Sequence, residues 1–212
     1  MTFLSREDAG RKLGERLREN SVAPELVLGL PRGGVIVAAG VAQVLDRPLD
    51  VIVVRKIGHP RHREFAVGAL AEGDVIVLDE EAIASTQVAR DELEKVIAEE
   101  KDRLREYQLK FRRESSAQLA GKSVCVVDDG LATGATAEAA VLSVRKRAAN
   151  QVVIAAPVAS ESAFARLGRS ADEVIALLVD PMFDAVGRYY EKFEQTTDEE
   201  VIEILRRQNR AG

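Results

Sequence analysis

Short apolar runs alternate with stretches of helical periodicity along most of the chain. The runs at 26–30, 51–54, 124–127, 152–156 and 174–179 are rich in branched apolar residues and predict buried strands. Helical spacing predicts helices at 5–20, 35–45, 135–147 and 161–167. Because helices link successive strands, the pattern predicts an α/β fold, with a mainly parallel, twisted sheet flanked by helices.

Side-chain chemistry refines several of these elements. Ser5 suits the N-cap of the first helix, with Leu13 and Leu17 on its apolar face. In the helix at 135–147, Ala139 and Leu142 are expected to face the core. The runs at 66–70 and 75–78 flank the turn sequence AEGD and predict a β-hairpin.

One segment, 85–116, exceeds what a minimal α/β unit needs. Its apolar residues recur at helical spacing, its acids come early and its basic residues late, which predicts one long amphipathic helix. Its apolar stripe would be covered either by docking on the core of the same chain or by contact with a second copy in a homodimer. No repeat or low-complexity linker divides the sequence, so residues 1–212 are expected to form one domain, with the insertion 85–116 and a C-terminal hood and helix at 179–208.

Composition narrows the class of protein. The chain has 212 residues, of which 46% are hydrophobic and 31% charged, as is typical of soluble globular proteins. A net charge of -5 argues against nucleic acid as a main partner. The single cysteine, Cys125, excludes a disulfide framework and a thiolate metal cluster. The first residues lack signal-peptide features and no run could span a membrane, so a cytoplasmic location without a membrane partner is expected.

The most informative string is VCVVDDGLATGAT at 124–136, where two acids follow an apolar run. In a parallel sheet this loop lies at the carboxyl end of a strand, and the next helix offers free N–H groups to an anion. Asp128 and Asp129 can accept hydrogen bonds from a vicinal diol, so the string predicts a site for a ribose 5-phosphate. An Asp-rich turn before a threonine-capped helix would explain the two acids but not the whole string. The candidate binding residues are Asp128, Asp129, Gly130, Ala132, Thr133, Gly134, Ala135 and Thr136.

A second loop, GLPRGGV at 29–35, also ends a predicted strand and opens a helix. Arg32, Gly33 and Gly34 can together receive another anion, although a turn that merely needs glycine would share this pattern. Together with the loop at 124–136, this gives two separate candidate anion sites.

The string at 124–136 resembles the signature of type I phosphoribosyltransferases, in which a strand and two acids precede three variable residues and Thr-Gly-Gly/Ala-Thr/Ser. The loop at 29–35 resembles the pyrophosphate loop of the same family, which implies a cis peptide bond between Pro31 and Arg32. The resemblance implies the type I fold, 5-phosphoribosyl 1-diphosphate as substrate, and Mg²⁺ held mainly through that ligand rather than by a protein metal site. It also implies transfer of ribose 5-phosphate to a nitrogen acceptor with release of pyrophosphate.

The segment RKIGHPRHREFAVG at 55–68 corresponds in position to the mobile catalytic loop of that family, and its RKIG is similar to adenine-type members. The resemblance implies that Arg55 and Lys56 meet the diphosphate. It further implies catalytic roles for Arg61, Arg63 and Glu64. The two histidines, at positions 59 and 62, lack zinc-type partners and are expected to be exposed loop residues.

The segment 179–195 concentrates aromatic residues in a chain with only 4% aromatics. Phe183 and Tyr189 are candidates for binding a nucleobase, and an aromatic cap over the core is an equal alternative. Ala132 stands where the hypoxanthine-guanine members of the family carry an acidic residue, so the resemblance does not identify the acceptor substrate. A non-catalytic sensor of the same ligand is the alternative function, whereas a phosphohydrolase would need a water-activating base that the sequence does not show.

Overall fold

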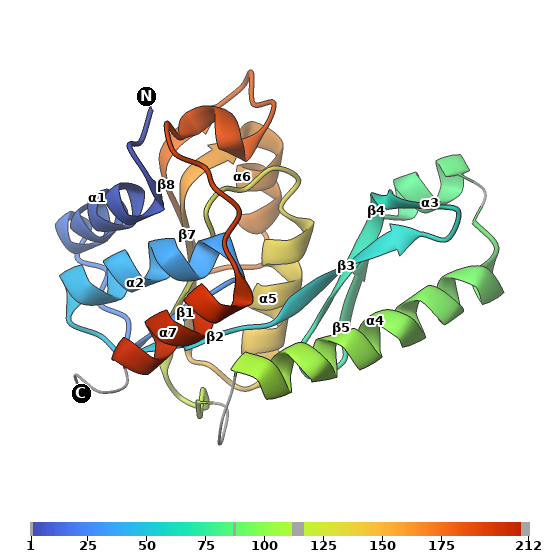
Figure 1. Ribbon diagram of the computed structural model, residues 1–212, viewed down its shortest axis with the longest axis horizontal. Coiled ribbons are helices and arrows are strands. Elements are labelled where there is room, and N and C mark those ends of the chain that lie inside the picture. Colours follow the sequence, from blue (N-terminus) through green and yellow to red (C-terminus); the bar gives the residue numbers. More distant parts are fainter. Residues whose placement is uncertain (1, 87, 112–116, 209–212) are drawn as a thin grey trace.

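The computed structural model describes residues 2–86, 88–111 and 117–208. Within these ranges a five-stranded sheet has the order β2-β1-β6-β7-β8, and every neighbouring pair is parallel. Its strands are β1 (Leu26–Gly29), β2 (Leu49–Val51), β6 (Ser123–Val127), β7 (Gln151–Ser160) and β8 (Glu173–Asp180). The predicted α/β fold with a parallel sheet is therefore confirmed (Figure 1).

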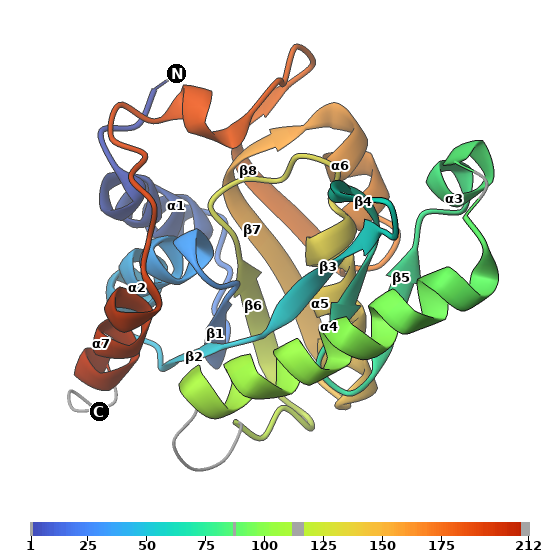
Figure 2. The same cartoon turned by 45° about the vertical axis from the view of Figure 1, so that its right-hand side comes forward.

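Helices cover both faces of this sheet (Figure 2). The cluster on one face includes Val27, Cys125 and Val127, packed against helices α1, α2 and α7, whereas Leu28 and Val126 point to the opposite face and α5. Because both faces are buried, the strands read as continuous apolar runs rather than as alternating ones. The helices are α1 (Arg6–Glu19), α2 (Gly33–Leu45), α5 (Ala135–Lys146), α6 (Glu161–Leu167) and α7 (Asp198–Gln208).

Local sequence signals account for several helix boundaries. Ser5 caps α1, and its side chain accepts a hydrogen bond from the Asp8 N–H, as predicted. The prediction for Leu142 is wrong, because its side chain is 36% exposed while α5 turns smaller residues such as Ala140 and Val141 toward the sheet. The peptide bond between Pro31 and Arg32 is cis, as the resemblance implies.

A second, antiparallel sheet projects from the first in the part of the chain described (Figure 1). It consists of β3 (Val54–His59), β4 (His62–Ala71) and β5 (Val75–Leu78), so the hairpin predicted across AEGD is confirmed. The expected strand at 51–54 is wrong as a single element, because the extended chain changes partners within it. The Ile52 N–H still donates to Gly29 in the parallel sheet, whereas the Val53 carbonyl accepts from Glu72 beside the second sheet.

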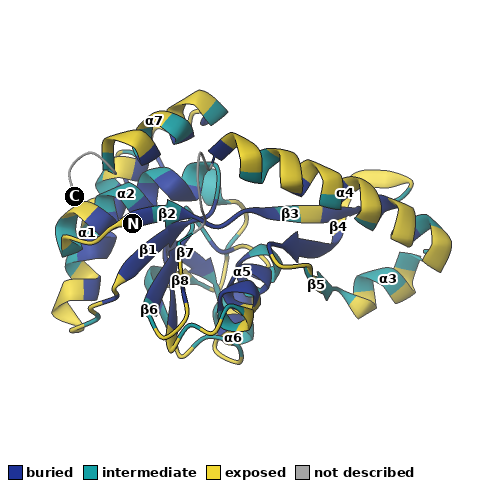
Figure 3. Ribbon diagram, turned by 90° about the horizontal axis from the view of Figure 1, so that it is seen from below, coloured by how far each residue is buried: buried dark blue, intermediate teal, exposed yellow. Residues whose placement is uncertain are grey.

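The long insertion is two helices rather than one. The structure places a short helix, α3 (Glu80–Thr86), before α4 (Arg90–Phe111), and residues 112–116 of the predicted helix lie outside the described ranges. The Ser85 and Thr86 hydroxyls both donate to the Ala82 carbonyl, a local bond that competes with helix continuation. α4 buries Leu93, Val96, Leu104 and Phe111, and its other face is exposed (Figure 3).

The C-terminal part crosses back over the first residues of the chain. After β8, the 3-10 helix η1 (Val186–Tyr189) packs beside Phe3, and the Phe3 and Tyr190 rings lie 5.5 Å apart. We call residues 191–197 the strap, since they connect this hood to α7. None of the described helices has the length and apolar character needed to cross a membrane.

Glycines permit the close crossing of α1 and α2. A Cβ atom at Gly10 would lie 2.4 Å from the Val37 carbonyl oxygen, and one at Gly40 would lie 2.9 Å from the Arg11 nitrogen. We expect Gly10→Ala to lower the free energy of unfolding by about 2 kcal/mol, because backbone atoms cannot move aside cheaply. Gly168→Ala is the matched control: its added methyl would have no neighbour nearer than 3.6 Å, and its effect should stay within about 0.5 kcal/mol. Denaturant unfolding measures both, and equal stabilities would contradict this account of the crossing.

Candidate functional site

The two acids of the signature string lie at the carboxyl edge of the parallel sheet. β6 ends at Val127, and Asp128 and Asp129 follow it directly. One Asp128 carboxylate oxygen accepts a hydrogen bond from the Asp129 N–H at 2.8 Å. This bond orients the Asp128 side chain at the point where open α/β sheets bind ligands.

The glycine loop after β1 lies against these acids. β1 and β6 are neighbours in the sheet, and the Leu30 N–H donates to the Val127 carbonyl at 2.9 Å. A Cβ atom at Gly33 would lie 2.0 Å from an Asp129 carboxylate oxygen, and one at Gly34 would lie 2.9 Å from the Asp128 Cα. No larger residue fits either position without movement, so glycine is required by the contact between the two loops.

Arg6 is a site residue that the sequence did not reveal. It is 9% exposed, and its Nε donates to the Asp129 carboxylate at 2.8 Å while Nη1 donates to the Glu194 carbonyl at 2.8 Å. The guanidinium also lies 3.9 Å from the Phe193 ring centre, within cation–π distance. A basic residue in the first turn of a helix opposes the helix dipole, and this was the available signal that Arg6 has another role.

The acid pair is electrostatically asymmetric. Burial, followed by the nearby Asp129 charge, raises the pKa of Asp128 to about 8, while Lys56 and Arg6 act in the opposite direction. Asp129 instead holds the direct ion pair with Arg6. The Asp128 carboxyl is therefore close to its protonation equilibrium at neutral pH.

The remainder of the signature string forms an open loop before α5. Gly134 is the N-cap of α5 with φ 75°, and the Ala135 N–H points to the Thr133 hydroxyl at 3.5 Å. Ala132 and Thr133 are exposed, Ala135 and Thr136 are half-buried, and the Ser160 hydroxyl donates to the Ala132 carbonyl at 2.5 Å. Free N–H groups at the start of α5 and the threonine hydroxyls can therefore receive an anion.

A cavity of about 370 Å³ joins the acid pair to the glycine loop and the strap. Among the predicted site residues, Arg32, Gly33, Asp128 and Asp129 line it. Its other lining residues are Arg6, Pro31, Phe193, Glu194, Gln195 and Thr196. Arg32 also lies 3.8 Å from the Asp198 carboxylate at the start of α7, so the C-terminal helix contributes to the charge around the opening.

The segment 55–68, which corresponds in position to the mobile catalytic loop, forms part of the β3–β4 hairpin. Arg61 and Arg63 form ion pairs with Glu92 and Glu99 of α4, at 3.3 and 2.8 Å. Glu64 is exposed on β4. The structure therefore places the three proposed catalytic residues on the projecting sheet, and none of them lines the cavity with the acids.

The other basic residues of β3 differ in their surroundings. Arg55 forms an ion pair with Glu100 at 2.9 Å and lies 5.2 Å from the Tyr107 ring centre, so α4 holds its side chain. Lys56 is exposed and close enough to Asp128 to lower the pKa of that acid. Of the two basic residues, Lys56 is the one whose charge acts on the Asp128 carboxyl.

The histidine prediction is wrong for His59. Its side chain is 6% exposed because the hairpin folds over it, and its Nδ1 accepts a hydrogen bond from the Arg61 N–H at 3.1 Å. His62 is exposed, and the two rings lie 5.4 Å apart. In the described ranges, no group of three or more His, Cys, Asp or Glu side chains has the arrangement of a metal site.

Phe183 and Tyr189, the two candidates for base binding, stack on each other with ring centres 5.4 Å apart. Tyr189 is 8% exposed, and its hydroxyl donates to Asp180 at 2.7 Å. Most of its side chain therefore packs within the hood. Phe193 lines the acid-pair cavity instead, and the Tyr190 hydroxyl donates to the Asp129 carbonyl at 2.6 Å.

Comparisons with known proteins agree with this geometry. A family model described as "Phosphoribosyl transferase domain" matches residues 4–172. Rv0571c of Mycobacterium tuberculosis H37Rv, which carries a provisional phosphoribosyl transferase name, is 43% identical to this chain over 209 residues. The match covers 98% of this chain and 47% of Rv0571c, so this chain spans about half the length of that relative.

Solved structures extend the comparison. The protein TT1426 from Thermus thermophilus superposes with a TM-score of 0.80 at 45% identity, covering 97% of this chain and 98% of that one. A purine phosphoribosyltransferase from Pyrococcus horikoshii superposes with a TM-score of 0.50 at 20% identity, covering 92% of this chain and 97% of that one. The second likeness shows a shared fold.

The raised pKa of Asp128 gives a prediction for stability. A carboxyl whose pKa is higher in the folded state opposes folding as it ionises, so its cost is absent below its ordinary pKa of 3.8 and is complete above about 8. Asp128→Asn should therefore match the wild type near about pH 4 and exceed its free energy of unfolding by at least about 1 kcal/mol near about pH 9.

Asp172→Asn is the matched control with the opposite sign. The Val152 N–H, the largest influence, lowers the pKa of Asp172, so that variant should lose stability at neutral pH and approach the wild type in acid. Denaturant unfolding across this pH range measures both variants. An Asp128→Asn protein that is less stable than the wild type at alkaline pH would contradict the prediction.

Proposed function

Because the chain belongs to the phosphoribosyl transferase domain family, we propose that it uses 5-phosphoribosyl 1-diphosphate to transfer ribose 5-phosphate to a nitrogen acceptor. The observation that carries this proposal is the direct contact between Gly33 and Asp129. It brings an anion site at the start of α2 within one cavity of two hydroxyl-binding carboxylates. A ligand with a diphosphate next to a ribose diol matches that pair of features.

Each part of the site has a role in this proposal. The start of α5, with Thr133 and Thr136, binds the 5-phosphate through N–H and hydroxyl donors. Asp128 and Asp129 accept hydrogen bonds from the ribose hydroxyls. Arg32, Lys56 and the glycine loop N–H groups bind the diphosphate.

Mg²⁺ fits this arrangement through the ligand. The two acids offer carboxylate oxygens, the donors that Mg²⁺ prefers, and Mg²⁺ usually keeps several waters when phosphates supply its other ligands. The ion would neutralise diphosphate charge, with Asp128 and Asp129 holding it through water or ribose hydroxyls. The positive charges of Arg32 and Lys56 would also neutralise negative charge on the diphosphate, which is the leaving group.

The reaction exchanges one bond at the ribose C1′ atom for another. The bond from C1′ to the diphosphate oxygen breaks with its electron pair, the acceptor nitrogen bonds to C1′, and that nitrogen releases a proton. Positive charge that develops on the ribose is stabilised by nearby carboxylates, and negative charge on the departing pyrophosphate by the basic groups around Arg32. Phe193, which lines the cavity, and Phe183, which stacks on the buried Tyr189, supply aromatic surface for the acceptor on the hood side.

A sensor of the same ligand is the second candidate. It is favoured by the ion pairs that hold Arg61 and Arg63 on α4, away from the acid-pair cavity. In an enzyme these arginines would have to leave Glu92 and Glu99 to reach the diphosphate. The two functions therefore differ in what the β3–β4 hairpin does when ligand binds.

Pyrophosphate release tests the proposed enzyme. The wild type is incubated with 5-phosphoribosyl 1-diphosphate, Mg²⁺ and separate purine, pyrimidine and amine acceptors, and we expect release with at least one acceptor. Replacing Asp128 and Asp129 together by Asn should abolish release and weaken ligand affinity by about tenfold or more, because the anionic acceptors are lost. Asp102→Asn, on the exposed face of α4, is the matched control and should behave as the wild type. Unchanged affinity in the double variant would remove the basis of the proposal.

The arginines of the hairpin separate the enzyme from the sensor. If they act as the leaving group departs, replacing Arg61 and Arg63 by Ala should lower kcat by roughly a hundredfold with little change in ligand affinity. Replacing Arg90 and Arg105 by Ala, which removes the same charge from α4, should change neither quantity. A sensor would release no pyrophosphate with any acceptor, and its hairpin variants would alter binding alone.

A further inference from the structure

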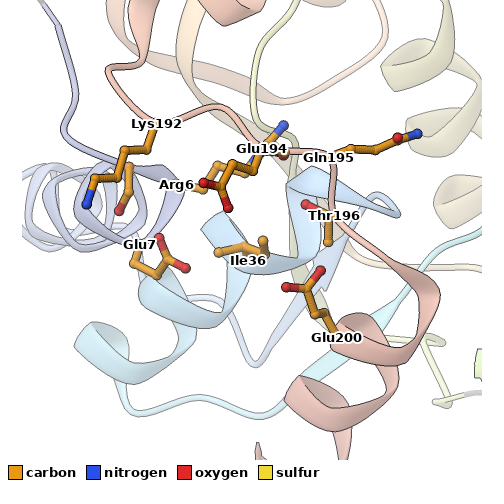
Figure 4. A pocket seen from close by; sticks show the side chains of 9 residues that line it. Arg6, Glu7, Ile36, Lys192, Glu194, Gln195, Thr196 and Glu200 are labelled. Atoms are coloured by element: carbon orange, nitrogen blue, oxygen red, sulfur yellow. Dashed lines mark hydrogen bonds between the residues drawn. The ribbon is translucent and has the colours of Figure 1, made fainter.

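The strap places Thr196 at the border of two cavities. One is the cavity of about 370 Å³ that contains the acid pair. The other, of about 210 Å³, lies beside it between α1, the first turns of α2 and the strap (Figure 4). Both cavities are lined by Arg6, Glu194, Gln195 and Thr196, so these residues form the wall between them.

Thr196 is the member of this wall whose buried polar group has no hydrogen-bond partner within the described residues. Its side chain is only 5% exposed, and its hydroxyl oxygen, which is fully buried, makes no hydrogen bond there. Arg6, by contrast, donates to Asp129 and to the Glu194 carbonyl. Buried hydroxyl groups in native proteins almost always have a hydrogen-bond partner, so the Thr196 hydroxyl points to a bound molecule.

The hydrogen-bond donors at the start of α2 distinguish the two cavities. Each cavity is lined by three carboxylate and two basic residues, so their formal charges do not favour one over the other for a phosphate. The larger one brings Thr196 together with Arg32 and Gly33, at the start of α2, where N–H groups and a guanidinium favour an anion. A threonine hydroxyl can donate to a phosphate oxygen in the same way as a backbone N–H.

We propose that the Thr196 hydroxyl is a further binding group of the site and donates a hydrogen bond to a phosphate oxygen of the diphosphate at the start of α2. This inference rests on the proposed function, since it takes the diphosphate as the ligand of that cavity. It gives the strap a role in binding, because residue 196 reaches the ligand only when the chain passes over the glycine loop. The C-terminal hood and the glycine loop then hold the leaving group from two sides.

Thr196→Val tests the proposal, because valine has nearly the same shape and lacks the hydroxyl. Removing a buried hydroxyl that has no hydrogen-bond partner in the described part of the chain should leave the melting temperature unchanged or higher. The affinity for 5-phosphoribosyl 1-diphosphate with Mg²⁺, measured by calorimetry, should fall by roughly tenfold or more, as expected for a lost bond to a charged group. Thr196→Ser keeps the hydroxyl and should stay within about threefold of the wild type.

Thr197→Val is the matched control one residue away. The Thr197 hydroxyl accepts a hydrogen bond from the Glu200 N–H at 3.2 Å, and Glu200 accepts in return from the Thr197 N–H at 2.7 Å, which forms a capping box for α7. This variant should therefore lower the melting temperature by a few degrees without changing ligand affinity. The two neighbouring substitutions are expected to have opposite effects on stability and on binding.

Two results would overturn the inference: wild-type affinity in Thr196→Val, or a loss of stability comparable to that of Thr197→Val. Either result would mean that the Thr196 hydroxyl binds a water molecule or stabilises the fold instead of binding the diphosphate. Inorganic pyrophosphate with Mg²⁺ is titrated in parallel as a second probe. Binding of pyrophosphate without binding of 5-phosphoribosyl 1-diphosphate would sink the proposed function and still test Thr196, whereas binding of neither would overturn both.

Discussion

The contact between the glycine loop and the acid pair is the constraint on which the rest of the site depends. Gly33 and Gly34 let the backbone after β1 lie directly against Asp128 and Asp129, where any Cβ atom would collide with them. That contact exists because β1 and β6 are hydrogen-bonded neighbours with their carboxyl ends at one edge of the sheet. The glycine loop and the carboxylate pair, which are distant in sequence, thereby line one cavity.

Holding two adjacent carboxylates at the end of a buried strand carries an electrostatic cost, and the protein offsets part of it with Arg6. The guanidinium binds Asp129, stacks on Phe193 and holds the strap through the Glu194 carbonyl. Asp128 has no comparable direct ion pair among the described contacts, and its pKa is raised by burial and by Asp129. Such a conflict between stability and binding is common where a site must accept hydrogen bonds from a ligand.

The projecting sheet is organised by charge pairs with α4. Glu92, Glu99 and Glu100 hold the three arginines of the hairpin, while Lys110 at the other end of α4 pairs with Asp198 at 2.5 Å. Asp198 lies in turn near Arg32 of the glycine loop. The insertion thus contacts both the hairpin and the C-terminal helix through ion pairs.

The sequence by itself determined the local features of this protein. Strands such as β6, helices such as α6 and the loops at 29–35 and 124–136 follow from apolar runs, caps and glycines that act over a few residues, and the resemblance placed them in a family. The break after Thr86 and the exposure of Leu142 were missed because they depend on local hydrogen bonds and helix rotation that apolar spacing alone does not specify.

Tertiary structure alone decided which side chains meet. Arg6 reaches Asp129 across 123 residues of sequence, and Thr196 lines the same cavity as the glycine loop although the two are far apart in the chain. Arg61 and Arg63 form ion pairs with α4, contacts between distant segments that local patterns did not indicate. Local patterns encode elements because short-range bonds fix them, whereas contacts between distant residues depend on how sheet order and chain crossings pack the whole molecule.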